Sequence, residues 1–329
     1  MFVALELPTS FFTFGTSAIL LIIRINLLKL DWQLSCQPIS YLNMMRTNRR
    51  TLLKTAASTA IAGTLLTAPK PAHAQNPKDQ ANPKFRIQNG RIKQSIMGWT
   101  FNPMPTPELA KLCKEVGLVA MEGISPKYYP MVKELGLDIS LVGSHGFKKG
   151  PVDPANHGEC IEKLTEAIEL CAAAGYKRVI TFTGMKAEGI EDEEAEENCI
   201  TCWKKVLPLA EKKGVTLCLE HLNSRDDSHP MKGHPGYFGD DVDHCVKMIE
   251  KVGSSSLKLL FDVYHVQVMN GDVIRRINQY KEVIGHYHTA GNPGRAELDD
   301  KQEINYPGVM KALVNTGYDG YVAQEFMPT

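Results

Sequence analysis

The chain has 329 residues, 43% of them hydrophobic, with 37 lysines and arginines against 37 aspartates and glutamates. This length allows one large domain or two small ones. The even charge balance leaves no basic excess for holding phosphates, and we therefore expect no nucleic acid among the partners.

The N-terminal part of the chain predicts a processed leader. Arg49 and Arg50 form a twin-arginine pattern, an uncharged and mildly apolar run follows at 55–68, and Ala-His-Ala at 72–74 offers the small residues that a signal peptidase reads. This order is typical of an export signal, so residues 45–74 are predicted to be a twin-arginine signal peptide. The alternative is an amphipathic helix with a chance arginine pair. An exported, periplasmic protein without a stable membrane span in its mature form is expected.

Residues 1–44 fit this leader poorly. The apolar run 11–23 is interrupted at Arg24 before a full membrane span is reached. Met44 and Met45 stand just before the arginine pair, where a signal peptide normally starts. The upstream segment is therefore interpreted as a doubtful, mis-called start, and a genuine N-terminal anchor is the alternative.

Cleavage after Ala74 would leave about 255 residues, the usual size of one α/β barrel. The leader holds seven of the 37 basic and two of the 37 acidic residues, so the mature chain would carry a net charge of −5. Residues 75–88 are rich in Pro, Asn, Gln and Lys and predict a flexible spacer. The mature charge argues further against a nucleic-acid groove.

The cysteines of the mature chain do not form a disulfide framework. There are seven, an odd and scattered set, at positions 113, 160, 171, 199, 202, 218 and 245. Cys199 and Cys202 lie within a predicted helix, and no second pair completes a zinc site. We expect the cysteines to be buried as small hydrophobic residues.

Short apolar runs then alternate with segments whose apolar residues recur at helical spacing. The runs predicted as strands are 94–101, 118–124, 138–143, 178–183, 216–222, 257–264, 284–289 and 320–326. The predicted helices between them are 106–116, 128–135, 158–174, 192–213, 240–251, 271–280 and 307–315. Strict alternation predicts a parallel sheet, and eight strands predict closure into a single-domain (β/α)8 TIM barrel over residues 89–329.

An eighth helix is missing from this pattern, because the sequence stops soon after the eighth predicted strand. That side of the barrel is expected to be open, or covered by the spacer or by a partner. A homo-oligomer is one such possibility.

Four successive predicted strands each end on a metal-binding type of side chain: Glu220, Asp262, His288 and Glu325. Each alone is explained by a helix cap or a buried core histidine. Barrel enzymes place catalytic groups at these strand ends, however, and three carboxylates buried together are costly unless a cation pairs with them. Three oxygen donors and one imidazole suit a single divalent ion such as Mn²⁺, Mg²⁺, Co²⁺ or Zn²⁺.

Motifs at these strand ends and in the loops after them carry a family resemblance. They are LEHLN at 219–223, PGYF at 235–238, FDVYH at 261–265, HYHTAG at 286–291, EINYP at 303–307 and QEF at 324–326. Through them, the chain from about residue 94 to 327 resembles the xylose-isomerase-like barrel superfamily, and within it the hydroxypyruvate isomerase group. The resemblance implies that hydroxypyruvate is interconverted with 2-hydroxy-3-oxopropanoate.

The same resemblance implies residue roles. The four strand-end residues would be ligands of one divalent ion, Glu220 and Glu325 would also be the catalytic acid–base pair, and His265 and Arg295 would hold the substrate. Elementary chemistry agrees, because isomerising a small hydroxy-carbonyl compound moves a proton between adjacent carbons through an enediolate. A divalent ion that contacts both oxygens would stabilise the developing negative charge.

Two features separate this chain from the hydroxypyruvate isomerase pattern. Some members carry Gln at the third ligand position, whereas His288 is the choice of related ketose 3-epimerases. The segment 226–234, with His229 and His234, is longer than the compact family loop. A ketose 3-epimerase or an inosose-type dehydratase therefore stays open, and a pocket without a group that clamps a carboxylate would favour a sugar. A non-catalytic, exported sugar-binding barrel is the alternative from another class.

Overall fold

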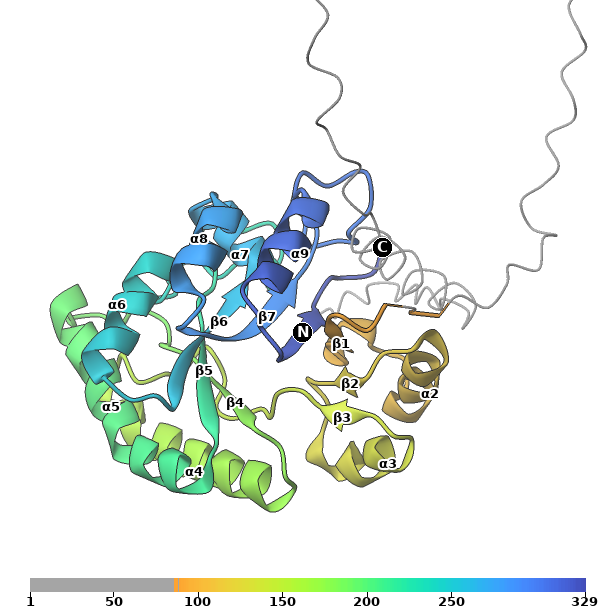
Figure 1. Ribbon diagram of the computed structural model, residues 1–329. Coiled ribbons are helices and arrows are strands. Elements are labelled where there is room, and N and C mark those ends of the chain that lie inside the picture. Colours follow the sequence, from red (N-terminus) through yellow and green to blue (C-terminus); the bar gives the residue numbers. More distant parts are fainter. Residues whose placement is uncertain (1–85, 88) are drawn as a thin grey trace, which may run out of the picture. The chain divides into compact units, whose positions relative to one another are not determined.

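The computed structural model describes residues 86–87 and 89–329 (Figure 1). The strands in these residues are β1 (Lys93–Ile96), β2 (Ala120–Met121), β3 (Asp138–Ile139), β4 (Arg178–Thr181), β5 (Thr216–Glu220), β6 (Leu257–Asp262), β7 (Ile284–Thr289) and β8 (Tyr321–Gln324). A six-stranded parallel sheet has the order β1-β8-β7-β6-β5-β4, and β2 and β3 form a second parallel pair.

Isolated parallel bridges join the two sheets. Met97, just after β1, pairs with Glu122, just after β2, while Val142, just after β3, pairs with Val179 of β4. Each strand thus neighbours the next one in the sequence, and β8 returns to β1. This arrangement confirms the predicted TIM barrel.

The helices pack mainly around the outside of the strands (Figure 1). They are α2 (Thr106–Val116), α3 (Tyr129–Glu134), α4 (His157–Ala173), α5 (Asp192–Lys213), α6 (Val242–Val252), α7 (Val263–Met269), α8 (Val273–Tyr280) and α9 (Tyr306–Asn315). Short 3-10 turns occur at η3 (Trp99–Phe101), η4 (Pro126–Tyr128) and η5 (Pro154–Asn156). No helix follows β8 within the described residues.

Local sequence signals explain the ends of these helices. Gly214 and Gly253 follow α5 and α6 with φ of 64° and 74°, the left-handed conformation that glycine adopts without steric cost. At the other end of α6, the Asp241 carboxylate accepts a hydrogen bond from the His244 backbone N–H. Both ends of α6 are therefore satisfied by residues directly outside it.

Seven of the eight predicted strands end earlier in the structure than in the prediction, and for two of them the structure shows which element begins instead. β1 stops at Ile96, because residues 99–101 form the η3 turn instead. β6 stops at Asp262, whose Oδ1 accepts hydrogen bonds from the N–H groups of Tyr264 and His265 and so begins α7. The extent of the predicted strand 257–264 was wrong, since this side-chain cap competes successfully with strand pairing.

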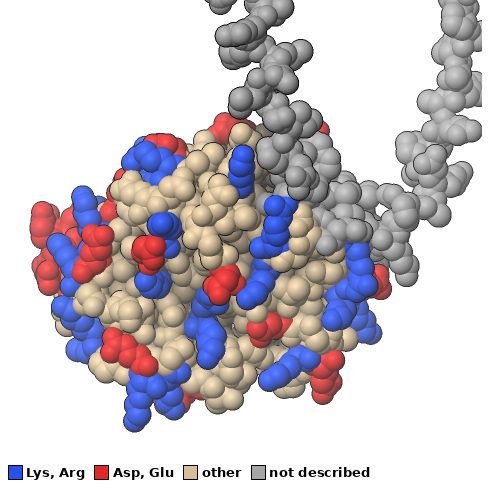
Figure 2. Space-filling view, in the orientation of Figure 1, with Lys and Arg blue, Asp and Glu red and all other residues tan. Residues whose placement is uncertain are grey.

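Other expectations concern the cysteines and membranes. All seven cysteines of the described residues are free and buried, as predicted. Within the same residues, no helix is both long and apolar enough to cross a bilayer. On the face shown in Figure 2, basic and acidic side chains are interspersed over the barrel.

Side chains alternate between the two faces of a strand, and this alternation determines which residues point into the barrel. Residues two apart share a face of a strand, so Cys218 lies beneath Glu220, Leu260 beneath Asp262, and His286 beneath His288. Cys218 and Leu260 pack together with Leu141 as a small, fully buried cluster. The polar groups at the carboxyl ends of the strands therefore stand on a largely apolar layer.

Candidate metal centre

The four residues predicted at the strand ends converge in the structure. Glu220 and Asp262 are the last residues of β5 and β6, His288 is the next-to-last residue of β7, and Glu325 directly follows β8. One ligand atom from each lies within 4.8 Å of the others, and every one of the four side chains is buried. The barrel register thus places three carboxylates and one imidazole around a common point.

The imidazole of His288 lies between two of these carboxylates. Its Nδ1 is 2.7 Å from Glu325 Oε2 and 3.1 Å from Glu220 Oε1. The Oδ2 of Asp262 is fully buried and has no hydrogen-bond partner, although Oδ1 of the same carboxylate caps α7. A buried carboxylate oxygen without a donor is a costly feature that a cation would relieve.

The pKa values of the four candidate ligands also indicate a cation site. Burial and the negative charge of Glu325 raise the pKa of Glu220 to about 7. Burial also raises the pKa of Asp262, against the opposing effect of Arg295. Burial alone would lower the pKa of His288, but the carboxylates of Glu325 and Glu122 outweigh it and raise that pKa well above its usual value. The donor set therefore fits a divalent ion, with three oxygens and one nitrogen in the range that Mn²⁺, Mg²⁺, Co²⁺ and Zn²⁺ accept.

Arg295, one of the two predicted substrate-binding residues, lies at the same centre. Its Nη2 is 2.7 Å from Glu325 Oε2 and 3.7 Å from Asp262 Oδ2, and its Nη1 donates to the Met231 carbonyl at 2.6 Å. The Arg295 backbone has a φ of 53°, a left-handed conformation that costs on the order of 1 kcal/mol for a residue other than glycine. The surrounding contacts hold the guanidinium against two of the candidate ligands.

His265, the other predicted substrate-binding residue, lies in the first turn of α7 and is fully buried. Its Nδ1 accepts a hydrogen bond from the Asn223 backbone N–H at 3.0 Å, so its proton is on Nε2, which lies 3.6 Å from Asp262 Oδ2. Burial and the charge of Arg295 lower the pKa of His265 well below its usual value, which keeps the ring neutral. In this structure the ring faces Asp262 and does not line the cavity described next.

A cavity of about 250 Å³ lies over the carboxyl ends of the strands. Glu220 and Glu325 reach its surface, whereas the other two candidate ligands lie behind them. Aromatic and aliphatic side chains make up most of its wall: Met97, Trp99, Leu141, Phe147, Ile180, Phe182, Leu222 and Met231. This volume lies just below the roughly 300–1,000 Å³ of drug-sized pockets and suits a small metabolite.

The long segment 226–234 forms part of this wall. The Tyr264 hydroxyl and the Asn223 amide both donate to the Lys232 carbonyl, at 3.0 Å and 2.7 Å, and fix the segment to α7 and the end of β5. His234 lines the cavity, with its ring centroid 4.2 Å from that of Phe147. His229 is exposed and does not line it. Of the two histidines noted in this segment, only His234 is placed to meet a ligand.

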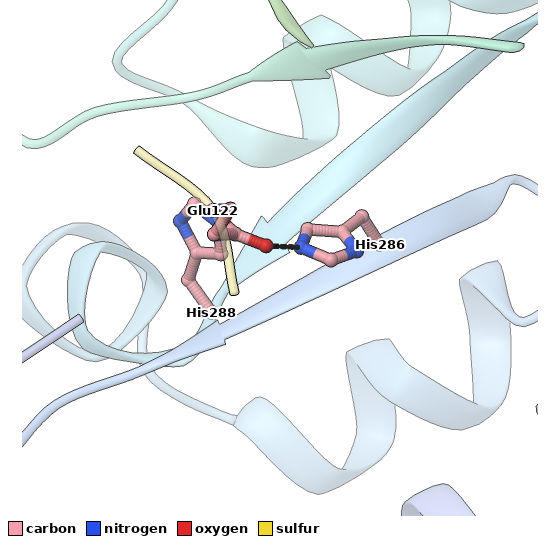
Figure 3. A group of neighbouring side chains, drawn as sticks. All are labelled: Glu122, His286 and His288. Carbon is pink, nitrogen blue, oxygen red and sulfur yellow. Dashed lines mark hydrogen bonds and ion pairs between the residues drawn. The ribbon is translucent and has the colours of Figure 1, made fainter. Parts of the chain in front are cut away.

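The structure also adds residues that the sequence analysis did not select. Glu122 follows β2, lines the floor of the cavity and contacts both histidines of β7 (Figure 3). A signal was present, because Glu122 is a charged residue near the end of the predicted strand 118–124. His286 was noticed only as part of a motif, and it lies behind His288.

A parallel barrel with a buried set of metal-ligand side chains at the carboxyl ends of β5–β8 defines a class of α/β-barrel proteins with a candidate divalent-ion centre. The family model described as xylose isomerase-like TIM barrel matches residues 108–327. The chain belongs to this family, which confirms the resemblance found in its motifs.

Two relatives with assigned names are each less than 30% identical to this chain in sequence. The chain is 28% identical to hydroxypyruvate isomerase of Escherichia coli (strain K12) over 175 residues, which are 53% of this chain and 65% of that protein. It is 29% identical to 2-oxo-tetronate isomerase of Cupriavidus necator, over 53% of this chain and 64% of that one. The matched region thus spans just under two thirds of the length of these relatives.

Solved structures share the fold. A protein described as AP endonuclease, family 2, from Brucella melitensis has a TM-score of 0.63 at 24% identity, covering 71% of this chain and 92% of that one. L-ribulose 3-epimerase has a TM-score of 0.59 at 19% identity, covering 71% and 81%.

Proposed function

We propose that this protein is a metal-dependent isomerase of small α-hydroxy-carbonyl compounds, with hydroxypyruvate and 2-hydroxy-3-oxopropanoate as the first pair to test. The observation that carries the proposal is the placement of Glu220 and Glu325. Both belong to the candidate ligand group and both reach the cavity surface. They can therefore stand beside an ion and face the reacting carbons of a substrate at the same time. The names of the two curated relatives support an isomerase.

The reaction requires one proton to leave a hydroxyl-bearing carbon and another to reach its neighbour. One glutamate accepts the first proton, and a glutamate in its acid form supplies the second. With its pKa raised to about 7 by burial and by Glu325, Glu220 is suited to exchanging a proton near neutral pH. A bound divalent ion supplies charge stabilisation for the two substrate oxygens. The apolar wall excludes water, which strengthens these electrostatic effects.

In this proposal Arg295 and His265 support the substrate. Arg295 lines the cavity beside Glu325 and can turn one of its N–H groups to a substrate oxygen. His265 holds its Nε2 proton toward Asp262 and acts from behind the ligand group. Arg295 would contact the substrate directly, and His265 would do so only if the Asp262 side chain moved toward an ion.

A second candidate, a ketose 3-epimerase, is favoured by the cavity wall. Arg295 is the one lysine or arginine among the lining residues of the described chain, and it already pairs with Glu325. A three-carbon acid needs a cation for its carboxylate, whereas a sugar needs hydroxyl partners and flat apolar faces. Trp99, Phe147 and Phe182 offer such faces. His288 at the third ligand position agrees with this alternative.

A substrate panel on protein reconstituted with Mn²⁺, Mg²⁺, Co²⁺ or Zn²⁺ separates the candidates. It contains hydroxypyruvate, ketohexoses and inosose, and turnover of hydroxypyruvate is the expected result. Turnover of a ketohexose alone would establish the epimerase. Tight binding of sugars without turnover of any compound would establish a non-catalytic binding barrel.

The Glu220→Gln and Glu325→Gln variants test the mechanism in the same assay. With metal occupancy matched to the wild type, each should keep much of the substrate affinity and lose roughly 10²–10⁴-fold in turnover, because an amide cannot accept a proton from carbon. One of them should still exchange the substrate hydrogen with deuterated solvent. Near-normal turnover in both variants would show that these glutamates are not the proton-transfer pair.

We also propose that the enzyme is exported by the twin-arginine route. The signal peptide 45–74 and the upstream segment 1–44 lie outside the described residues, as does most of the spacer 75–88, so this proposal depends on the sequence pattern alone. Changing Arg49 and Arg50 to Lys should retain the precursor inside the cell. Unchanged export of that variant would contradict it.

A further inference from the structure

A second buried cluster lies next to the candidate metal centre, on the same strand as His288. Figure 3 shows Glu122, from the segment after β2, between the imidazoles of His286 and His288. Glu122 Oε1 is 2.7 Å from His288 Nε2, and Oε2 is 2.9 Å from His286 Nε2. Glu122 is 1% exposed and both histidines are fully buried. The cluster spans the barrel interior from β2 to β7.

The contact to Glu122 decides which nitrogen of His288 keeps its proton when an ion binds. An ionised carboxylate only accepts hydrogen bonds, so the Nε2 that faces it must be the donor. Each oxygen of Glu122 faces at least one N–H or O–H group, Oε1 that of His288 and Oε2 those of His286 and Ser140, which is the arrangement of an ionised carboxylate. Nδ1, on the other side of the ring, faces the carboxylates of Glu220 and Glu325, so an ion bound there would displace the Nδ1 proton and leave the Nε2 proton in place. Nδ1 is the nitrogen that a metal ion at the four-residue centre would need.

Glu122 is itself held firmly in place. The Ser140 hydroxyl donates to Oε2 at 2.6 Å, and Ser95 lies 2.5 Å behind Ser140. The Glu122 backbone N–H donates to the Ile96 carbonyl, and the Gly98 N–H donates to the Glu122 carbonyl, at 3.0 Å and 2.7 Å. Side chain and main chain are therefore both fixed by β1 and β3, on the opposite side of the barrel from His288.

We propose that Glu122 is the positioning residue of the metal centre. It orients the His288 ring and holds the proton on Nε2, so that Nδ1 is presented to the ion. This inference rests on the proposed metal centre and deepens it, since it names a fifth residue on which ion binding depends. A carboxylate behind a ligating histidine is a general way to raise the basicity of the ligand and fix its orientation.

The test measures Zn²⁺ affinity by competition with a chromophoric chelator, for wild type and Glu122→Gln. The glutamine amide can accept from only one imidazole and confronts the other with N–H groups, so His288 loses its fixed orientation. We expect a 10–100-fold loss of Zn²⁺ affinity, the range found when such carboxylates are removed. The matched control is Asp243→Asn, which removes the partner of Arg276 in a partly buried ion pair on α6 and α8. It should change Zn²⁺ affinity less than about twofold, because distant sites act independently.

The outcomes are distinguishable. Wild type that binds no ion would overturn the proposed metal centre and this inference together. Wild type with one Zn²⁺ per chain and an equally tight Glu122→Gln variant would overturn this inference alone. Two Zn²⁺ per wild-type chain, reduced to one by Glu122→Gln, would assign Glu122, His286 and His288 to a second ion site instead.

A measurement on the wild type covers the case in which the variant does not fold. Nitrogen-15 spectra of the histidine rings in the Zn²⁺-loaded protein should show His288 with its proton on Nε2 and the ion on Nδ1. The reverse assignment would overturn the proposal. A purely structural role for Glu122 would predict no particular assignment.

Discussion

The two halves of the barrel rim contribute different chemistry. β5 to β8 bring Glu220, Asp262, His288 and Glu325 to one point. The segments after β1 to β4 bring apolar and aromatic side chains to the cavity, among them Trp99, Phe147 and Phe182. The half formed by β5 to β8, here called the acidic half, can hold an ion and move protons. The half formed by the segments after β1 to β4, here called the apolar half, determines which groups may be attached to the reacting carbons of a substrate.

This division shows why the family is easier to assign than the substrate. The acidic half is constrained by the geometry of a single ion, so its residue types can be recognised from the sequence. The apolar half is constrained only by the shape of a ligand, and many combinations of apolar residues satisfy it. Glu122 is the link between the halves, since it belongs to the segment after β2 and contacts β7.

The largest effect is expected from Asp262→Ala, which should abolish ion binding by the acidic half. The variant removes Oδ2, which has no hydrogen-bond partner, and should lose the ion, with a fall in turnover of roughly 10³-fold, because a metal contributes several kcal/mol and about 1.4 kcal/mol is tenfold. The cap of α7 is lost as well, at about 1 kcal/mol. Elemental analysis and circular dichroism measure the two effects.

Asp262→Asn is the matched control, because the amide oxygen can still cap α7 while the negative charge is gone. It should retain the stability of the wild type and still bind the ion poorly. Unchanged metal content in Asp262→Ala would show that the centre is wrongly placed.

A smaller effect is expected from pH. The pKa of Glu220 is raised to about 7, so a proton occupies this ligand below that pH and competes with the ion. The Glu220 proton should therefore add a loss of affinity of about tenfold per pH unit below pH 7, and above that pH only the proton on His288 still competes with the ion. Titrations of the ion between about pH 5.5 and 8 measure this slope, and Glu220→Gln should make it less steep below pH 7. An equally steep slope in that variant would assign the proton to another group.

The stability of the ion-depleted protein should change in the opposite direction. A carboxyl group whose folded pKa lies above its ordinary value of 4.5 binds more protons in the folded than in the unfolded state. Between these two pKa values, the contribution of Glu220 to the free energy of unfolding therefore decreases as pH rises. Adding the ion should reverse this trend.

The sequence predicted the position of the acidic half more completely than the rest of the site. The four candidate ligands were selected because each ends a buried apolar run, a local pattern, and the structure brings them together. Glu122 was not selected, because its partners lie 164 and 166 residues away and meet it only after the barrel closes. α7 was missed because its start depends on the Asp262 side chain, which could equally have continued the strand. Strand order and most helices followed from periodicity, while cross-barrel contacts required coordinates.

The smallest effect is expected at His234, which follows β5 in the segment 226–234 and lines the cavity beside Phe147 of the apolar half. No protein group forms a hydrogen bond with its ring among the described residues, the residue lines the cavity, and burial together with Arg295 lowers its pKa to about 4. A neutral imidazole in this position can bind a hydroxyl group at the far end of a substrate. His234→Phe keeps the contact with Phe147 and removes that hydrogen bond.

For a ketohexose, His234→Phe should raise KM, or Ki if the sugar is not turned over, by about 5–10-fold, which corresponds to one hydrogen bond of about 1 kcal/mol. For hydroxypyruvate, which has no hydroxyl group beyond its two reacting carbons, the change should stay below about twofold. The exposed His229, changed to Phe, is the control from the same segment and should alter neither value. Metal affinity and kcat should stay constant in both variants, since neither histidine belongs to the ligand group. A fall in metal affinity in His234→Phe, with KM unchanged, would mean that the apolar wall supports the ion and that the two halves of the rim do not act separately.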